Sequence, residues 1–137
     1  MIDIRWRAGF DNLELNALHA EAFGTASSVY DWVQKVYRHS LGWVTARRDR
    51  ELVGFVNVAW DGGSHAFLLD TMVRQAERRQ GLGRQIVECA VKGARAAGCE
   101  WLHVDFEDQY ESFYLTGCGF EATRAGLIAL QTGEGSQ

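Results

Sequence analysis

The sequence predicts an α/β (α+β) fold in which helices lie on both faces of a mixed central sheet. Short apolar segments with the composition of strands alternate with amphipathic helical segments along the chain. A tight turn at Asp49-Arg50 joins two of these strands as an antiparallel hairpin. The strand at residues 66–73 leads instead into an arginine-rich loop and then into a helix. This alternation is typical of a layered α/β domain.

Length and composition agree with one globular domain. The chain has 137 residues, of which 47% are hydrophobic and 23% are charged. These are ordinary values for a domain that buries a single core. We expect the domain to span residues 1–131, and we expect residues 132–137 to form a flexible tail because they are small and polar.

Composition also argues against several classes of function. No apolar run reaches the roughly 18 residues of a membrane span, so we expect no membrane partner. The net charge of −4 and the isoelectric point near 5.5 argue against nucleic-acid binding. Three cysteines without CxxC spacing favour reduced thiols and a cytoplasmic location. The histidines are scattered, and we expect no metal site.

The N-terminal third predicts one strand and two helices. Residues 2–6 form a short first strand. Asp11 and Glu14 have the spacing of a capping box at the start of the first helix. Ser28 is expected to cap the second helix. The apolar faces of the two helices consist of Leu15, Leu18 and Ala22 and of Val29, Trp32, Val33 and Val36.

The middle of the chain predicts the hairpin, a further strand and the longest helix. Residues 43–47 and 52–60 are the strands of the hairpin, and residues 61–64 form a loop before the next strand. The helix begins at Leu82 and ends near Gly98. Its apolar stripe consists of Ile86, Val87, Ala90, Val91 and Ala94.

The last third predicts the remaining strands. Residues 101–106 have the pattern of a strand, and residues 109–116 have that of a short helix. Residues 120–123 and 127–130 are expected to be two strands that close the sheet. The central sheet would therefore have six or seven strands.

The loop at residues 73–84 is the most informative segment. Gly81 and Gly83 remove Cβ atoms where a backbone approaches another group closely or takes a positive φ. The helix that starts there exposes unpaired N–H groups and the positive end of its dipole. Arginines at positions 74, 78, 79 and 84 stand against one acid, Glu77, in a chain that is acidic overall. We predict a phosphate-bearing ligand at this loop.

Two familiar phosphate loops do not match this segment. A Walker A loop needs a lysine and a hydroxyl residue after its last glycine, and neither follows Gly83. The dinucleotide fingerprint needs a third glycine, where this chain has Ile86. Asp105 lies near the position of the acidic residue that the fingerprint expects, so a nucleotide-binding α/β domain stays open.

A resemblance to a known family rests on the same loop. The sequence Arg-Arg-Gln-Gly-Leu-Gly at residues 78–83 resembles the Gln/Arg-x-x-Gly-x-Gly/Ala signature of the GNAT superfamily of acyl-CoA-dependent N-acyltransferases. Residues 69–73 are similar to the strand that leads into this signature. Residues 112–120 resemble the family's Phe-Tyr-x-x-x-Gly-Phe ending, with one extra residue before the last glycine. The resemblance covers residues 66–120.

The resemblance implies a GNAT fold whose sheet is splayed between the fourth and fifth strands, where acetyl-CoA lies. It implies transfer of the acetyl group to a primary amine by direct attack in a ternary complex. Tyr114 stands where the family places a tyrosine that faces the cofactor sulfur, so it is the implied general acid. The implied cofactor-binding residues are Met72, Val73, Arg78, Arg79, Gln80, Gly81, Leu82, Gly83 and Arg84.

This chain departs from the family pattern shortly before the tyrosine. Glu107 and Tyr110 stand where Asn and Ala are frequent. No carboxylate stands out as the general base, and Asp70, Asp105, Glu107 or a water chain could serve. His103 and Asp105 share one face of a predicted strand, where they either line the cleft or pair with a neighbouring arginine.

The acceptor is less well specified. The stretch at residues 100–111 holds acids but no lysine or arginine, which favours a cationic amine, either a small molecule or a peptide. A solvated acidic turn explains the same stretch equally well.

Two residues near the end of the motif have simpler structural interpretations. From spacing alone, Tyr114 is also compatible with a core position. Cys118 is expected to be a structural thiol, because a helix C-terminus raises a thiol pKa.

Three classes of function remain. The first is an N-acetyltransferase that uses acetyl-CoA. The second is a catalytically silent GNAT-like module that binds acyl-CoA and acts through a partner. The third is an unrelated nucleotide-binding α/β domain. The sequence leaves open the identity of the acceptor, the length of the acyl group and the oligomeric state, a homodimer included.

Overall fold

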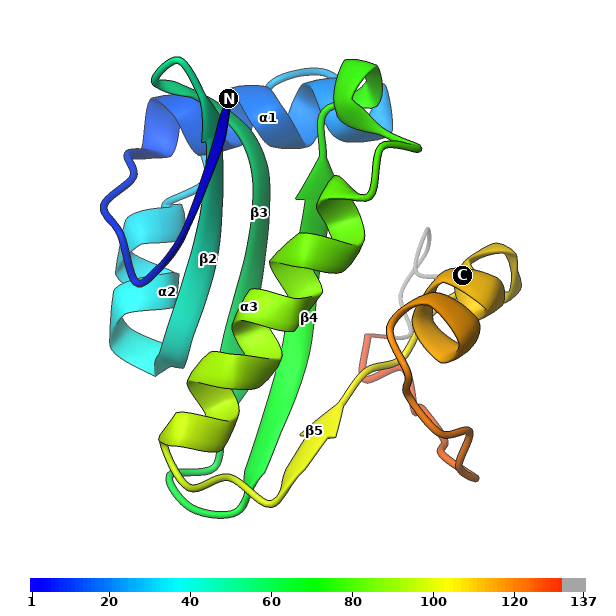
Figure 1. Ribbon diagram of the computed structural model, residues 1–137. Coiled ribbons are helices and arrows are strands. Elements are labelled where there is room, and N and C mark those ends of the chain that lie inside the picture. The colour runs from blue at the N-terminus through cyan, green and yellow to red at the C-terminus, as the bar shows by residue number, and fades with distance from the viewer. Residues whose placement is uncertain (132–137) are drawn as a thin grey trace.

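A computed structural model describes residues 1–131 of the chain. The described part is built on a five-stranded sheet in the order β1-β2-β3-β4-β5 (Figure 1). β1 to β4 pair antiparallel and β5 runs parallel to β4, which confirms the predicted mixed sheet. The strands are β1 (Ile2–Trp6), β2 (Ser40–Arg48), β3 (Glu51–Trp60), β4 (His65–Val73) and β5 (Trp101–His103).

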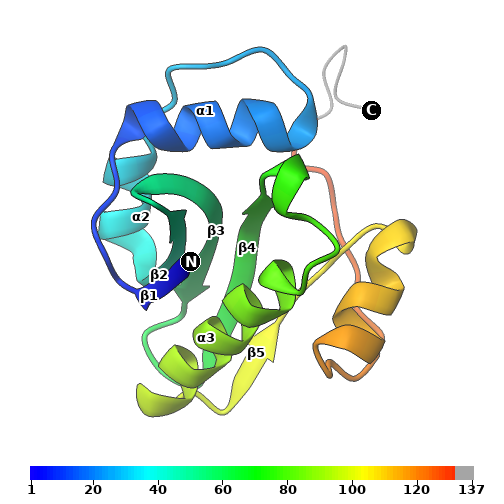
Figure 2. The ribbon, with the colours of Figure 1, turned by 45° about the horizontal axis from the view of Figure 1, so that its top comes forward.

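Three α-helices in residues 1–131 cover the sheet on both faces, as the sequence predicts. α1 (Asn12–Phe23) and α2 (Trp32–His39) lie on one face, and α3 (Leu82–Ala96) lies on the other (Figure 2). The buried side chains accordingly form two clusters. Ile86 and Val87 belong to the cluster under α3, while Leu15, Val36 and Phe55 belong to the one under α1 and α2. Full burial of an apolar side chain of this size stabilises the fold by about 1.5–3 kcal/mol.

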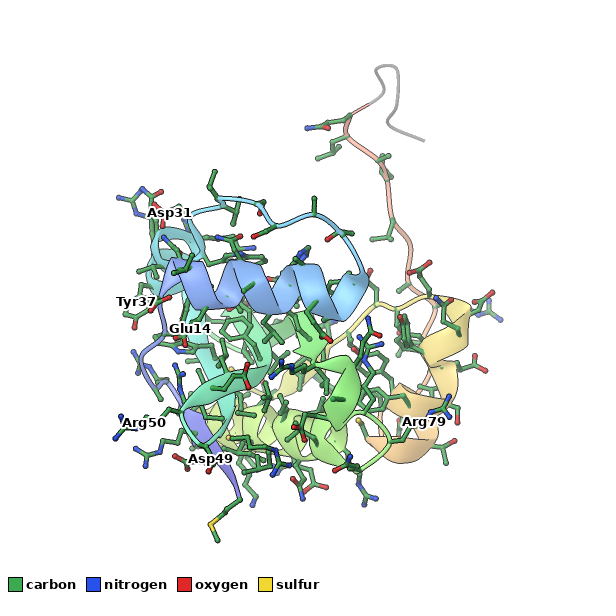
Figure 3. The ribbon with its side chains drawn as sticks, turned by 90° about the horizontal axis from the view of Figure 1, so that it is seen from above. Glu14, Asp31, Tyr37, Asp49, Arg50 and Arg79 are labelled. Carbon is green, nitrogen blue, oxygen red and sulfur yellow. The ribbon has the colours of Figure 1, made fainter. Side chains whose placement is uncertain are left out.

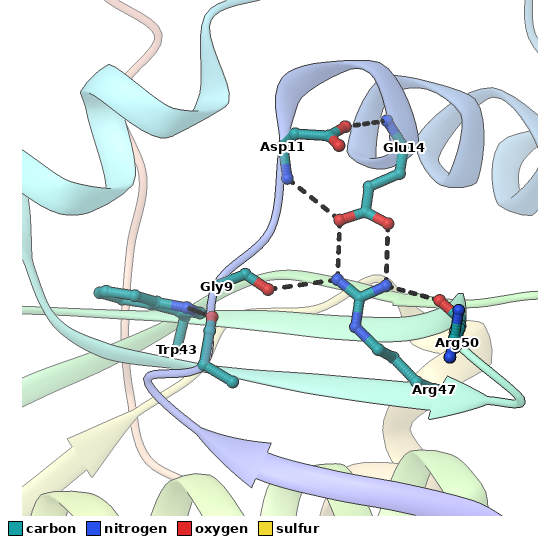
Figure 4. Close-up of polar contacts among 7 residues, drawn as sticks. Gly9, Asp11, Glu14, Trp43, Arg47 and Arg50 are labelled. Carbon is teal, nitrogen blue, oxygen red and sulfur yellow. Dashed lines mark hydrogen bonds and ion pairs between the residues drawn. The ribbon is translucent and has the colours of Figure 1, made fainter.

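The predicted capping box at the start of α1 is confirmed, and its glutamate also binds an arginine of β2 (Figure 4). Asp11 Oδ1 accepts the N–H of Glu14 at 2.8 Å, and Glu14 Oε2 accepts the N–H of Asp11 at 3.0 Å. The same Glu14 carboxylate accepts one hydrogen bond from each Nη atom of Arg47, at 2.8 and 2.7 Å. α1 is thereby fixed to β2 through a bidentate ion pair, which is stronger and geometrically more specific than a single hydrogen bond.

The start of α2 differs from the prediction. Asp31, not Ser28, caps the helix, because its Oδ1 accepts the Gln34 N–H at 3.1 Å. The Ser28 hydroxyl instead donates to Asn16 Oδ1 at 2.9 Å, so it is used to hold the preceding segment against α1. Val29 was expected on the apolar face of the helix but lies outside it and is 98% exposed.

The predicted hairpin turn between β2 and β3 is confirmed. Asp49 and Arg50 form the two-residue connection, and both have positive φ angles, 53° and 85°. This left-handed pair matches the right-handed twist of the flanking strands and so favours a tight hairpin. Both residues are exposed and are labelled in Figure 3.

The C-terminal part of the prediction is wrong in strand number. β5 ends at His103 instead of residue 106, and residues 120–123 and 127–130 are not paired in the sheet, which leaves five strands instead of six or seven. The reason is that the chain after His103 turns away from β4, so these segments have no adjoining strand edge. In place of one helix at residues 109–116 there are a 3₁₀ turn, Asp108–Tyr110, and a π-helical segment, Ser112–Gly117.

The predicted flexible tail at residues 132–137 lies outside the described residues. Within residues 1–131, no helix is both long and apolar enough to cross a membrane.

Candidate active site

The sheet opens where β4 and β5 part. The two strands pair at three positions, which end with Phe67 opposite His103, although β4 continues to Val73. This early separation is the splay expected between the fourth and fifth strands. Beyond it lies a cavity of about 420 Å³. The cavity is lined by His19 and Phe23 of α1, by Leu68, Leu69, Asp70 and Thr71 of β4, and by Val104, Asp105, Phe106, Glu107, Tyr110, Tyr114 and Leu127 of the C-terminal part.

A β-bulge shapes the wall of the cavity. Phe55 and Asn57 of β3 pair with Met72 and Leu69, so β4 has one extra residue in this stretch. Asp70 lies in the bulge and has a φ of 57°, which is rare for a residue other than glycine. The bulge therefore lies two residues before Met72 in the chain.

The bulge leaves one backbone donor of β4 facing the opening. The Arg74 N–H donates to Val53 O of β3 at 2.9 Å. Successive N–H groups along a strand point to opposite sides, so the Val73 N–H points away from β3, toward β5. By the same alternation the Met72 N–H points to β3, and its side chain is 1% exposed in the core. The backbone N–H groups of these two predicted cofactor-binding residues thus face different strands.

Tyr114 lies where β4 and the C-terminal segment come together. Its side chain is 8% exposed, and its hydroxyl donates to Thr71 Oγ1 of β4 at 3.2 Å. The ring stacks on Phe106, with centroids 5.0 Å apart. Burial raises the pKa of Tyr114, and the hydrogen bond to Thr71 opposes this effect more weakly. The phenol therefore holds its proton at neutral pH, as a proton donor must.

The start of α3 has the form of an anion site. Gly81 precedes the helix with a φ of 83°, and Arg79 also has a positive φ, 64°. The backbone N–H groups of residues 82–84 have no acceptor within residues 1–131. A Cβ at Gly81 would meet no atom within 4 Å, whereas a Cβ at Gly83 would lie 3.2 Å from the Phe113 ring. The two glycines therefore have different roles: Gly81 supplies a left-handed turn and Gly83 makes room for an aromatic ring.

Most arginines of the loop are engaged by the protein itself. Arg78 donates to the carbonyl of Val73 at 3.1 Å and to the carbonyl of Ala22 at the end of α1. Arg74 and Arg84 form ion pairs with Glu51 and Glu88, respectively. Arg79 is exposed at the loop (Figure 3) and has no ion pair within the described residues. The positive charge available to a ligand is therefore smaller than the sequence count indicates.

An ion pair that the sequence does not reveal holds this loop. Glu77 is 8% exposed and accepts two hydrogen bonds from Arg48 of β2, from Nε at 2.8 Å and from Nη2 at 2.9 Å. These hydrogen bonds lower the pKa of Glu77. The one acid of the basic loop is thus a structural anchor. Gln80 also acts within the loop, since its side-chain amide donates to Ala76 O at 3.3 Å.

The three candidate bases all line the cavity but differ in their hydrogen-bond partners. Asp70 accepts a hydrogen bond from Lys35 Nζ at 3.3 Å. Asp105 and Glu107 are exposed and have no side-chain hydrogen bond or ion pair in the described part. His103 neither lines the cavity nor pairs with an arginine: its Nε2 lies 2.7 Å from Nδ1 of His65.

The cysteines are not arranged for catalysis. All three are free thiols, and Cys118 is not among the residues that line the cavity. The pKa of Cys118 is raised, as expected, but burial is the main cause instead of the helix end. Residues 1–131 contain no group of three or more His, Cys, Asp or Glu side chains that could hold a metal ion.

Comparisons with known proteins bear on this geometry. The profile of the acetyltransferase (GNAT) family matches residues 8–120, which is most of the chain. No curated protein sequence matches significantly.

Solved structures share the fold at low sequence identity. A probable acetyltransferase of unknown function from meticillin-resistant Staphylococcus aureus is 20% identical, with 96% of this chain and 100% of that chain covered and a TM-score of 0.78. Glucosamine-6-phosphate N-acetyltransferase from Arabidopsis thaliana is 15% identical over 93% and 97% of the two chains, with a TM-score of 0.75. The aminoglycoside N-acetyltransferase AAC(6')-Iy, solved with a CoA bisubstrate analogue, is 16% identical over 96% and 99%, with a TM-score of 0.76. At these identities the likeness shows the fold alone.

Proposed function

The chain belongs to the acetyltransferase (GNAT) family, and from this premise we propose that it transfers the acetyl group of acetyl-CoA to a primary amine by direct attack in a ternary complex. The observation that carries the proposal is the cavity at the parting of β4 and β5, with the buried Tyr114 hydroxyl in its wall. Family membership excludes the third class of function, an unrelated nucleotide-binding domain. The catalytically silent module remains as an outcome of the test.

The start of α3 fits the pyrophosphate of acetyl-CoA. The free N–H groups of residues 82–84 and the left-handed turn at Gly81 form a concave set of donors at a helix N-terminus, which favours a phosphate group. Arg79 is the loop arginine without a protein partner in the described residues, so it is the one we assign to the phosphates. Arg78, tied to two carbonyls, acts by holding the loop against α1.

The cavity supplies what the transfer needs. The acceptor must arrive as a free amine, its nitrogen attacks the thioester carbonyl carbon, and the C–S bond then breaks. We assign the Val73 N–H to the carbonyl oxygen, because it points into the opening from β4 and donors placed there stabilise the developing oxyanion. We assign the Tyr114 hydroxyl as the acid that protonates the departing thiolate.

The acids around the cavity favour an acceptor that carries a positive charge. Asp70, Asp105 and Glu107 all line it, and the latter two are exposed. Their field attracts an ammonium group, and any of the three can accept the proton that the amine loses, directly or through water. The neighbouring structures include an aminoglycoside acetyltransferase and a glucosamine-6-phosphate acetyltransferase, which supports a small-molecule amine.

A screen of amines with acetyl-CoA, in which free thiol is measured, tests the proposal. Amino sugars, polyamines and N-terminal or lysine-containing peptides should be compared at the same concentration, with binding of acetyl-CoA measured separately by calorimetry. We expect binding, together with thiol release that depends on a cationic amine. Binding without thiol release for every amine would favour the silent module, and an absence of binding would refute the assignment of the loop.

A further inference from the structure

One amine of the chain itself contacts a residue of the cavity wall, although it lines a neighbouring hollow beside α2. Lys35 of α2 places its Nζ 3.3 Å from Asp70 Oδ2, and both side chains are partly buried, at 34% and 26% exposure. The ammonium also lies over two aromatic rings, 4.4 Å from the centroid of Trp32 and 5.2 Å from that of Tyr30. A carboxylate with two ring faces is a set of partners that selects an ammonium group.

Two of the partners of this ammonium connect it to the proposed active site. Asp70 lines the cavity, and the next residue, Thr71, accepts the hydrogen bond of Tyr114. On the other side, the Trp32 ring lies 5.7 Å from the ring of His19, which also lines the cavity. The Lys35 side chain is therefore held next to the wall against which the thioester is proposed to react.

We propose that Lys35 is an acceptor of the enzyme's own acetyl transfer, so that the protein acetylates itself at this residue. The inference rests on the proposed function. Lys35 first loses a proton, and the neutral Nζ then attacks the thioester carbonyl carbon. A C–N bond forms, the C–S bond breaks, and the thiolate takes up a proton. The overall change is acetyl-CoA and a lysine ammonium to an acetyl-lysine, CoA thiol and one proton. Asp70, already hydrogen-bonded to Lys35, accepts the ammonium proton.

The reaction is intramolecular and therefore has a large advantage over a free amine in solution. It also alters the site. An acetyl group removes the positive charge of Lys35, so the ion pair with Asp70 and the contacts with the aromatic rings are lost. The Asp70 carboxylate is then free to bind a cationic acceptor in the place that Lys35 vacates. Self-acetylation thus opens the acidic wall to the substrate.

The chain contains its own control. Lys35 and Lys92 are its two lysines, and Lys92 is exposed on α3, on the opposite face of the sheet. Chemical acetylation by acetyl-CoA, without catalysis, would favour the exposed Lys92. Acetylation by the active site would favour the partly buried Lys35. The ratio of the two therefore separates the two origins.

The test uses the full chain, freed of bound acetyl groups, and acetyl-CoA with an isotopically heavy acetyl group. Peptide mass spectrometry follows labelling of Lys35 and Lys92 over time in the native protein and in Lys35→Arg, Lys92→Arg and Tyr114→Phe. We expect Lys35 to be labelled at least about tenfold faster than Lys92, at a rate per molecule that does not depend on protein concentration. Tyr114→Phe should slow labelling of Lys35 and leave that of Lys92 unchanged.

Equal labelling of the two lysines, or labelling of Lys35 that Tyr114→Phe does not slow, would overturn the inference. Binding of acetyl-CoA and thiol release with small amines are measured on the same samples. If small amines are acetylated and Lys35 is not, self-acetylation is refuted and the proposed function stands. If acetyl-CoA does not bind, both are refuted.

Discussion

The two edges of β4 have opposite characters. Toward β3 the strand is paired from Ala66 to Val73, with one bulge. Toward β5 it is paired at three positions, and the next four residues, Leu68 to Thr71, line the cavity. An unpaired strand edge is normally a liability, because it leaves backbone donors without partners. Here the free edge lies beside the polar groups of the proposed site. Pairing on one side of β4 therefore builds the scaffold, and the unpaired side is the proposed binding surface.

Hydrogen-bond donors near the two edges also differ. On the paired side, Glu14 holds Arg47 and Glu77 holds Arg48, each with two hydrogen bonds. Near the open edge, the N–H groups of residues 82–84 have no acceptor in the described residues. The difference shows that a count of arginines does not locate a ligand. What matters is which donors the protein has left unused.

The largest expected effect comes from the hydroxyl that faces the open edge. Tyr114→Phe should keep the fold, because the ring still packs on Phe106, and should keep acetyl-CoA affinity. Turnover should fall by about 10²–10⁴-fold with little change in the KM for acetyl-CoA, since the proton is transferred in the transition state. Steady-state kinetics with the best acceptor checks this, together with a pre-steady-state measurement that establishes whether chemistry limits the rate.

Tyr110→Phe is the matched control for that variant. Tyr110 lines the same cavity but is 45% exposed, and its hydroxyl has no hydrogen-bond partner in residues 1–131. Its loss should leave turnover nearly unchanged. A similar loss in both variants, or full turnover in Tyr114→Phe when chemistry limits the rate, would contradict the role of Tyr114.

A smaller effect is expected at the left-handed turn before α3. Gly81→Ala should lower the free energy of unfolding by about 1–2 kcal/mol, because a residue with a Cβ is strained at a φ of 83°. It should also weaken acetyl-CoA binding, since the turn sets the donors of α3. Gly83→Ala has no such strain and should cost less, although its Cβ would press on Phe113. Urea denaturation and calorimetry of the two variants distinguish them. Equal destabilisation would argue against the separate roles of the glycines.

The Glu77–Arg48 ion pair on the paired side should make the free energy of unfolding depend on pH. Arg48 holds the pKa of Glu77 below its unfolded value of about 4.5, so the pair stabilises the fold above that value. This stabilisation should be lost as the pH falls through the lower pKa of the folded state. Glu77→Gln should be less stable at pH 7 and should lose less stability on acidification. Denaturation midpoints between pH 7 and pH 3 check this, and parallel curves for the two proteins would be evidence against it.

Much of the paired side could be predicted from the sequence, because its signals are local. The capping box at Asp11, the hairpin turn at Asp49 and the apolar stripe of α3 depend on residues a few positions apart. Near the open edge one signal is local as well, because the motif around Gly81 predicts the start of α3 and its free donors. Each of these elements is specified by nearby residues, and the structure confirms each of them.

The open side could be predicted less well, because its features depend on residues far apart in the chain. Lys35 and Asp70, for example, are separated by 35 positions. No periodicity marks such pairs. The apolar pattern after His103 indicated a longer strand and two further ones, yet a strand pattern forms a strand only where an edge is available. The splay that creates the cavity removes that edge.

Amide hydrogen exchange with and without acetyl-CoA tests most directly the claim that the open edge of β4 and the start of α3 bind the cofactor. The N–H groups of Val73 and of residues 82–84 have no acceptor within residues 1–131 and should exchange fast in the free protein. Acetyl-CoA should slow their exchange, while the amides that pair β1, β2 and β3 stay unchanged. Binding of acetyl-CoA without protection at these four amides would contradict the account.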